Sequence, residues 1–201
     1  MIKAVLFDFG GVIAEEGFRE GLFDLADRYG LDREEVFAAG REAVHGTGYV
    51  TGTGTEAAFW QALRERYGFE EADAELTAAV LERFRVRSTL LQRVRELGEA
   101  GLVRAIVSDQ TDWLERLDAR DGFFAAFDKV YNSYRLGKSK RDPTLFDDVV
   151  ADLGIAPGQA LFLDDKPEVA ERARSRGLQA ICCASEAGCL ARLYAALAGN
   201  V

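Results

Sequence analysis

The chain has 201 residues, enough for one compact domain or for one domain with a smaller inserted unit. Hydrophobic residues make up 48% of it and charged residues 29%, which suffices for a sizeable core under an ordinary charged surface. The formal net charge of −9 repels phosphate backbones and anionic lipid, so we expect neither nucleic acid nor a membrane as a partner.

The cysteines and the lengths of the apolar runs indicate the cellular compartment of the protein. Cys182, Cys183 and Cys189 are odd in number and clustered, which predicts no disulfide framework, and no second cysteine and histidine cluster completes a zinc site. Residues 1–7 are too few for a signal peptide. No apolar run approaches the roughly 20 residues that cross a bilayer. We therefore expect a reduced, cytoplasmic protein.

The first predicted element is a strand over residues 2–7, an apolar, β-branched run that stops at Asp8. Similar runs recur at residues 102–107, 129–131, 160–163 and 178–182. Helical stripes lie between the later runs, at Leu90, Val94 and Leu97, at Phe146, Val149, Val150 and Leu153, and at Val169, Ala170 and Ala173. This alternation predicts an α/β fold, a Rossmann-like parallel sheet with helices on both faces.

Residues 14–87 interrupt this alternation, because they show helical periodicity and no convincing strand. The apolar stripes are Leu22, Leu25, Ala26 and Tyr29, then Phe59, Trp60, Leu63 and Tyr67, then Leu76, Val80 and Phe84, while Asp32 and Glu35 form a candidate capping box. We predict a helical bundle cap over 14–87, inserted into a core of residues 1–13 and 88–201. The Gly/Thr-rich segment 46–55 follows no strand and lacks a P-loop lysine, which favours a flexible cap loop over a phosphate cradle.

Polar residues stand where the predicted strands end. They are Asp8, then Ser108-Asp109-Gln110, then Lys138 and Lys140 in the segment after the third strand, and finally Asp164-Asp165. In open parallel sheets, ligands bind beyond the carboxyl ends of the strands, so we expect these groups to converge.

Phosphoryl transfer is the chemistry that needs this set of groups. A carboxylate can attack phosphorus and form an aspartyl-phosphate. Carboxylates and a backbone carbonyl are ligands that Mg²⁺ prefers, and Mg²⁺ neutralises the charge that develops on the phosphoryl group. A lysine, a hydroxyl and loop amides can then hold the phosphoryl oxygens.

Four segments, in order, resemble motifs I to IV of the haloacid dehalogenase superfamily, and most of all its subfamily with a helical cap after motif I. The segments are Phe7-Asp8-Phe9-Gly10-Gly11-Val12, Ile106-Val107-Ser108-Asp109, residues 136–146 with Gly137, Lys140 and Pro143, and residues 161–168 with Asp164 and Asp165. The resemblance covers nearly the whole chain. It implies a Rossmann-like core, a helical cap and a Mg²⁺-dependent hydrolase.

The resemblance also implies a role for each site residue. Asp8 is expected to be nucleophile and metal ligand, with the carbonyl of Gly10, Asp165 and Asp164 completing the metal site. Ser108, the amides of Phe9, Gly10 and Asp109, and Lys140 are expected to hold phosphate, and Lys140 also to neutralise Asp8.

Gly10 departs from the family pattern. Family phosphatases usually carry a second aspartate at this position, where it protonates the leaving oxygen and later activates water; glycine can do neither. General acid–base catalysis is typically worth about 10²–10⁴-fold, so a slow enzyme is expected. Asp109, Glu15 and Glu16 stay open as substitutes. Arg141, where the family commonly has proline, is a second departure.

Three functions remain open after this reading. The favoured one is a slow Mg²⁺-dependent phosphatase of a small phosphorylated metabolite, such as a sugar phosphate. The alternatives are a phosphate-binding or regulatory protein that has lost turnover and a metal-free 2-haloacid dehalogenase, which the acidic pair Asp164-Asp165 disfavours. We expect a monomer or homodimer. A structural or solvent-facing role is favoured for His45, the one histidine, and Phe59 and Trp60 are expected in the core of the cap.

Overall fold

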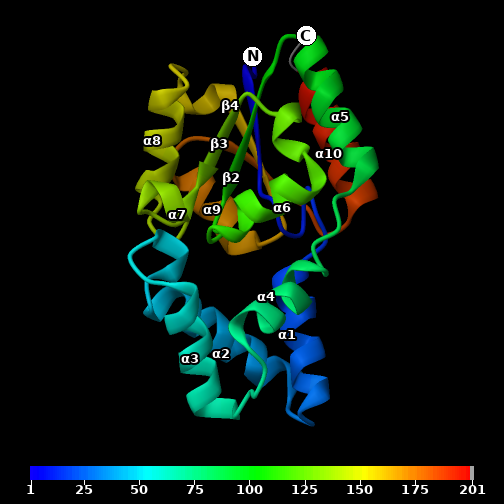
Figure 1. Cartoon of the computed structure of the whole chain (residues 1–201). Coiled ribbons are helices and arrows are strands. Elements are labelled where there is room, and N and C mark those ends of the chain that lie inside the picture. The colour runs from blue at the N-terminus through cyan, green and yellow to red at the C-terminus, as the bar shows by residue number, and fades with distance from the viewer. Residues whose placement is uncertain (200–201) are drawn as a thin grey trace.

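A parallel sheet of five strands forms the centre of the computed structural model, which describes residues 1–199 (Figure 1). The strands are β1 (Ala4–Phe7), β2 (Val103–Ser108), β3 (Lys129–Asn132), β4 (Ala160–Asp164) and β5 (Gln179–Cys182). Their order is β3-β2-β1-β4-β5, and every neighbouring pair is parallel. The predicted α/β fold is thus confirmed, with β1 in the middle.

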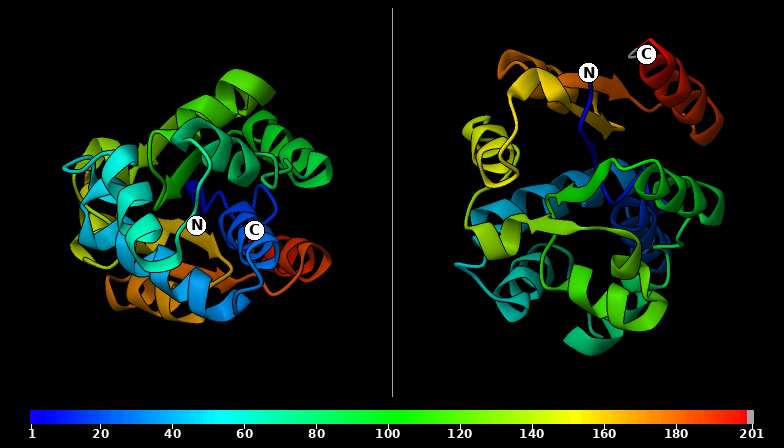
Figure 2. Two further views of the ribbon diagram at one scale, coloured as in Figure 1. Left: turned by 60° about the horizontal axis from the view of Figure 1, so that its bottom comes forward. Right: turned by 90° about the horizontal axis from the view of Figure 1, so that it is seen from above.

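Helices cover both faces of this sheet, as the apolar runs predict. On one face, Val5 and Phe7 of β1 share a core with α5 (Ser88–Glu99) and α10 (Glu186–Ala198). On the other face, Ala4 and Leu6 pack in a second core with α8 (Thr144–Asp152) and α9 (Pro167–Ser175). Seen from above, α8 lies on one side of the sheet and α5 and α10 on the other (Figure 2). Burial on both faces explains why β1 is apolar throughout.

The remaining core elements connect these strands. They are α6 (Trp113–Asp121), the 3₁₀ turn Phe123–Ala126, α7 (Ser133–Leu136) and the 3₁₀ turn Pro157–Gln159. Of these, α7 follows β3 directly and lies at the carboxyl end of the sheet, where the chain inserted after β1 also lies (Figure 1).

The helical insertion follows β1. It comprises α1 (Gly17–Arg28), α2 (Arg33–Gly46), the 3₁₀ turn Tyr49–Thr51, α3 (Glu56–Tyr67) and α4 (Asp73–Leu81). Phe59 and Trp60 are fully buried in it, as expected. Asp32 does cap α2 by accepting the Glu35 N–H at 2.8 Å. The exact boundaries, with a core of residues 1–13 and 88–201 and a cap of residues 14–87, stay a prediction.

Two chain segments join the insertion to the core, and they pair with each other. Ala14 and Val86 form an antiparallel bridge; the Glu15 N–H donates to the Arg85 carbonyl at 2.9 Å, and the Arg87 N–H donates to the Ile13 carbonyl at 2.8 Å. The insertion is therefore held directly beyond the carboxyl end of β1.

The Gly/Thr-rich segment contacts the core at two of its residues, and the expectation that it is flexible stays a prediction. The Ser133 hydroxyl donates to the Val50 carbonyl at 2.7 Å. At Gly52 the backbone has φ +70°, and an added Cβ would lie 2.3 Å from the Tyr134 carbonyl oxygen. The glycines thus permit a close approach between the insertion and α7.

The prediction that the cysteines form no disulfide is also wrong. Cys183 and Cys189 are joined by a disulfide, because the chain turns from β5 into α10 and brings their Cα atoms within 4.7 Å; Cys182 is free. The cytoplasmic location stays a prediction. Within residues 1–199, the helices are all too short or too polar to cross a membrane.

Two consecutive hydrogen bonds connect α3 with α4 in the insertion, and they lead to a prediction about stability. The Trp60 indole N–H donates to the Thr77 hydroxyl at 2.8 Å, and that hydroxyl donates to Glu56. We expect Thr77→Val to lower the free energy of unfolding by about 1–3 kcal/mol, because the buried indole N–H loses its partner. Denaturant unfolding measures this. The exposed Thr53→Val should change it by less than about 0.5 kcal/mol, and equal effects of both variants would contradict the account.

Candidate active site

Three carboxylates meet where β1 and β4 end. Asp8 directly follows β1, Asp164 ends β4 and Asp165 comes next; one oxygen from each lies within 4.8 Å of the others. Asp8 and Asp164 are buried, with 4% and 0% of their surface exposed. The register of adjacent parallel strands, in which Phe7 pairs with Leu163, brings these positions side by side.

Lys140 neutralises two of these carboxylates. Its ammonium lies 2.8 Å from Asp8 Oδ2 and 2.7 Å from Asp164 Oδ2, and the side chain is buried. Its backbone N–H donates to Asp109 Oδ1 at 2.7 Å, so the residue after β2 places the lysine. Burial alone would lower the pKa of Lys140, but the surrounding carboxylates of Asp164, Asp8 and Asp109 raise it above its usual range. The lysine is therefore a permanent cation.

The three carboxylates differ in how far nearby positive charge compensates their negative charge. Burial would raise the pKa of Asp8, but the charge of Lys140 outweighs it and lowers this pKa, so Asp8 is ionised. Burial raises the pKa of Asp164 to about 7 and also raises that of Asp165. Asp165 Oδ1 is a buried polar atom that lacks a hydrogen-bond partner within residues 1–199. An acidic cluster with an orphaned oxygen fits a hard divalent cation, because oxygen ligands are what Mg²⁺ takes.

The absence of a side chain at Gly11 leaves the space that the Asp165 side chain occupies. The backbone at Gly11 has φ +82°, and an added Cβ would lie 2.5 Å from Asp165 Cγ. The loop after β1 can thus approach the acidic pair only with glycine at this position.

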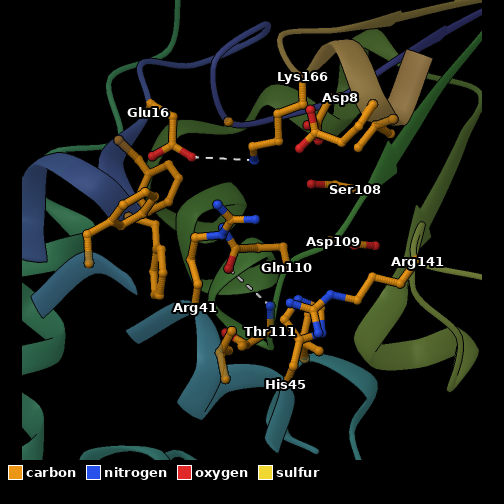
Figure 3. Close-up of a pocket in the computed structure, with 18 of the residues that line it drawn as sticks. Asp8, Glu16, Arg41, His45, Ser108, Asp109, Gln110, Thr111, Arg141 and Lys166 are labelled. Atoms are coloured by element: carbon orange, nitrogen blue, oxygen red, sulfur yellow. Dashed lines mark hydrogen bonds and ion pairs between the residues drawn. The ribbon is translucent and has the colours of Figure 1, made fainter. Parts of the chain in front are cut away.

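A cavity of about 140 Å³ opens beside this cluster, between the core and the insertion (Figure 3). Its wall contains four of the residues that the sequence singled out, namely Asp8, Gly10, Ser108 and Asp109. Lys140, Asp164 and Asp165 contact or adjoin Asp8 without lining the cavity. The Phe9 N–H donates to Asp8 Oδ1 at 2.7 Å, so in this structure that amide is committed to the carboxylate.

The insertion and the loops add further residues to the cavity wall. Arg41 and His45 come from α2, and Gln110, Thr111, Arg141, Lys166 and Arg172 come from the core. His45, Gln110 and Arg141 are noted in the sequence without a role in the site, whereas Arg41, Thr111, Lys166 and Arg172 are not expected there. His45, favoured as a structural residue, lines the cavity; burial, aided by the charge of Arg141, lowers its pKa to about 4, so it is neutral. Lys166 follows the acidic pair directly, and that position was its available signal. Nothing in the sequence marks Arg41, whose place depends on the docking of α2.

The three acids left open as substitutes at Gly10 lie in different surroundings. Glu15 is exposed and pairs with Arg87, with each carboxylate oxygen 3.1 Å from a guanidinium nitrogen. Asp109 lines the cavity but accepts the Lys140 N–H. Glu16 lines the cavity, and its Oε1 lies 3.8 Å from the Lys166 ammonium.

Comparison with known proteins agrees with this geometry. The family of haloacid dehalogenase-like hydrolases matches residues 2–177. A solved HAD family enzyme from Bacteroides thetaiotaomicron is 25% identical over 90% of this chain and 92% of its own, with a TM-score of 0.72. The same enzyme in complex with magnesium and inorganic phosphate matches with 23% identity, 90% and 93% coverage and a TM-score of 0.68.

An L-2-haloacid dehalogenase from Xanthobacter autotrophicus, with chloropropionic acid covalently bound, shares the fold. It is 22% identical over 90% of this chain and 76% of its own, with a TM-score of 0.67. Among curated proteins, none matches this chain.

The close packing at Gly11 leads to a prediction about stability, for which Gly30 provides the control. Gly11→Ala and Gly30→Ala both force alanine into a left-handed conformation, at φ +82° and +65°, which costs about 1–2 kcal/mol. At Gly30 nothing lies within 4 Å of an added Cβ, whereas at Gly11 it overlaps Asp165. We expect Gly11→Ala to cost about 1–3 kcal/mol more in chemical denaturation. Equal costs would contradict the close packing.

Proposed function

This chain belongs to the family of haloacid dehalogenase-like hydrolases, and we propose that within it the chain is a Mg²⁺-dependent phosphatase acting on a small phosphorylated metabolite. The observation that carries this proposal is the cluster of Asp8, Asp164 and Asp165 with the orphaned Asp165 Oδ1. A buried, unpartnered carboxylate oxygen is costly, and a bound cation relieves that cost. The magnesium and phosphate bound by the Bacteroides enzyme support the same reading.

Asp8, Asp164, Asp165 and the carbonyl of Gly10 would hold the metal. Mg²⁺ bound there supplies charge neutralisation for an anionic substrate next to an anionic nucleophile. The rest of the chemistry belongs to the chain. Lys140 keeps Asp8 ionised, so that a carboxylate oxygen can bond to phosphorus while the ester P–O bond breaks and the alcohol leaves with a proton from solvent.

The phosphoryl group would be held by groups at the ends of β1 and β2. The Ser108 hydroxyl and the amides of Gly10 and Asp109 are proposed to donate to its oxygens, since Gly10, Ser108 and Asp109 line the cavity beside Asp8. The Phe9 amide can join them only if it leaves Asp8 Oδ1. Asp109 accepts the Lys140 N–H and so positions the cation.

The charge of the cavity wall supports an anionic substrate. Arg41, Arg141, Arg172 and Lys166 face the cavity of a protein whose net charge is −9. None of the three arginines forms an ion pair within residues 1–199. The same wall also contains an equal number of carboxylates, among them Asp8, so its formal charge is balanced, and the support for an anion comes from the guanidinium groups that have no ion-pair partner among the described residues. The volume of about 140 Å³ suits a small metabolite.

A dehalogenase is the second candidate, favoured by the shared fold with the Xanthobacter enzyme. It needs a nucleophilic carboxylate but no cation, and it leaves the buried Asp164-Asp165 pair without a purpose. The third candidate, a regulatory protein arrested as phospho-Asp8, follows from the missing side chain at Gly10. Both are outcomes of the activity test below.

Metal binding can be tested without activity. Mg²⁺ at about 100 times its Kd should raise the free energy of unfolding by about 2.7 kcal/mol, seen as a Tm several degrees higher. Asp165→Asn should lose most of this rise, because the neutral amide lacks the negative charge of the carboxylate and offers the cation one oxygen instead of two. Asp148→Asn, which changes a surface carboxylate paired with Lys138, should keep it. A wild-type Tm that is the same with and without Mg²⁺ would argue against the metal site.

The activity test is a screen of small phosphate esters with Mg²⁺, run on wild type beside Asp8→Asn. We expect wild type to release phosphate from some esters, and Asp8→Asn to lose at least about 10³-fold because the nucleophile is gone. Chelator should abolish the release. Chloride released from 2-chloropropionate despite chelator would instead establish the dehalogenase. Lasting phosphorylation of Asp8 without turnover would establish the regulatory protein.

A further inference from the structure

Glu16 is a cavity carboxylate that the mechanism above does not use. It stands just before α1, at the junction between core and insertion, and lines the same cavity as Asp8. Figure 3 shows its side chain pointing towards Lys166, on the side of the cavity where Asp8 lies. Its Oε1 lies 3.8 Å from the Lys166 ammonium, and that ammonium lowers the pKa of Asp8 by its charge.

The side chain of Glu16 is anchored through one oxygen, so its other oxygen, Oε1, has a defined place. Oε2 accepts the Arg19 N–H at 2.8 Å as the N-cap of α1. The next residue, Gly17, is packed so tightly that an added Cβ would lie 2.5 Å from the Phe84 backbone nitrogen. These contacts fix one oxygen and the backbone, and they leave Oε1 facing the cavity.

Oε1 of Glu16 lies near the space that a side chain at residue 10 would enter. A Cβ built on Gly10 would be 4.0 Å from this oxygen and 3.5 Å from Phe84, both ordinary contacts. Gly10 itself lies two residues after Asp8 and puts no side chain there. A carboxylate reaching in from the start of α1 therefore stands close to the nucleophile's loop.

The neighbouring carboxylates are committed elsewhere or face solvent. Both oxygens of Glu15 pair with Arg87. Asp109 accepts the Lys140 N–H, and Glu168 is an exposed residue of α9 at the edge of the cavity. What distinguishes Glu16 from Asp109, which is also anchored through one oxygen and lines the cavity, is that Glu16 Oε1 lies 4.0 Å from a Cβ built on Gly10.

We propose, resting on the phosphatase function above, that Glu16 is the general base for hydrolysis of phospho-Asp8. Its carboxylate takes a proton from water while the water oxygen forms a bond to phosphorus. The bond between phosphorus and the Asp8 oxygen breaks, and its electron pair returns to the Asp8 carboxylate. Inorganic phosphate leaves, and Glu16 passes its proton to solvent.

The test compares turnover and phosphoenzyme in wild type, Glu16→Gln and Glu15→Gln, using a phosphate ester that the wild type cleaves. Glutamine keeps an oxygen that can accept the Arg19 N–H, so the cap of α1 is retained. Steady-state turnover of Glu16→Gln should fall by about 10²–10⁴-fold while phospho-Asp8 accumulates in the first turnover. Glu15→Gln should match wild type in both.

A rescue variant separates catalysis from structure. Gly10→Asp in the Glu16→Gln background puts a carboxylate into the same space, and it should recover turnover by about tenfold or more. Turnover of Glu16→Gln within about threefold of wild type, or a loss without accumulated phospho-Asp8, would overturn the inference. If wild type forms no phospho-Asp8, the phosphatase function fails and the inference falls with it. A phosphorylated wild type beside an unaffected Glu16→Gln refutes the inference alone.

Discussion

The ion pairs of Lys140 with Asp8 and Asp164 are the interaction on which the site depends. Three carboxylates gather where β1 and β4 end, and two of them are almost without exposed surface. One buried ammonium at 2.8 and 2.7 Å compensates part of that charge and keeps Asp8 ionised. The remaining negative charge, including the orphaned Asp165 oxygen, makes the cluster suited to a cation. Negative charge that the protein only partly neutralises is thus what the site offers to a metal, and the proposed anionic substrate would depend on that cation and on Lys140 to approach Asp8.

The fold brings these charges together through strand register, and it closes the site with the insertion. Parallel neighbours of β1 end on the same edge, so residues distant in sequence become adjacent. The paired connections around Ala14 and Val86 hold the insertion over that edge. As a result, α2 contributes Arg41 and His45 to the cavity wall, and the start of α1 contributes Glu16. The core supplies Asp8, the proposed nucleophile, and the insertion supplies part of the cavity wall.

The strands and the residues at their ends could be predicted from the sequence, because burial on both faces leaves near-continuous apolar runs that stop at polar residues. Asp8, Ser108 and Asp164 are found near one another for this reason, whereas Lys140 lies in the segment after α7 and is placed by the hydrogen bond from its N–H to Asp109. The cavity wall could not be predicted, since the positions of Arg41 and His45 depend on how α2 docks. The Cys183–Cys189 disulfide depends on the turn between β5 and α10, and the packed Gly52 turn on contact with α7. Such features arise from tertiary packing, which local sequence periodicity does not encode.

The central claim is that Asp8 takes the phosphoryl group. The most direct measurement is mass spectrometry of protein quenched in acid during turnover of a phosphate ester with Mg²⁺, after borohydride reduction of acyl phosphates. The account predicts that reduction marks Asp8, that the mark needs substrate and Mg²⁺, and that Glu168, exposed at the edge of the cavity, stays unmodified. Phosphate release with no modification of Asp8, at a quench time shorter than one turnover, would contradict it.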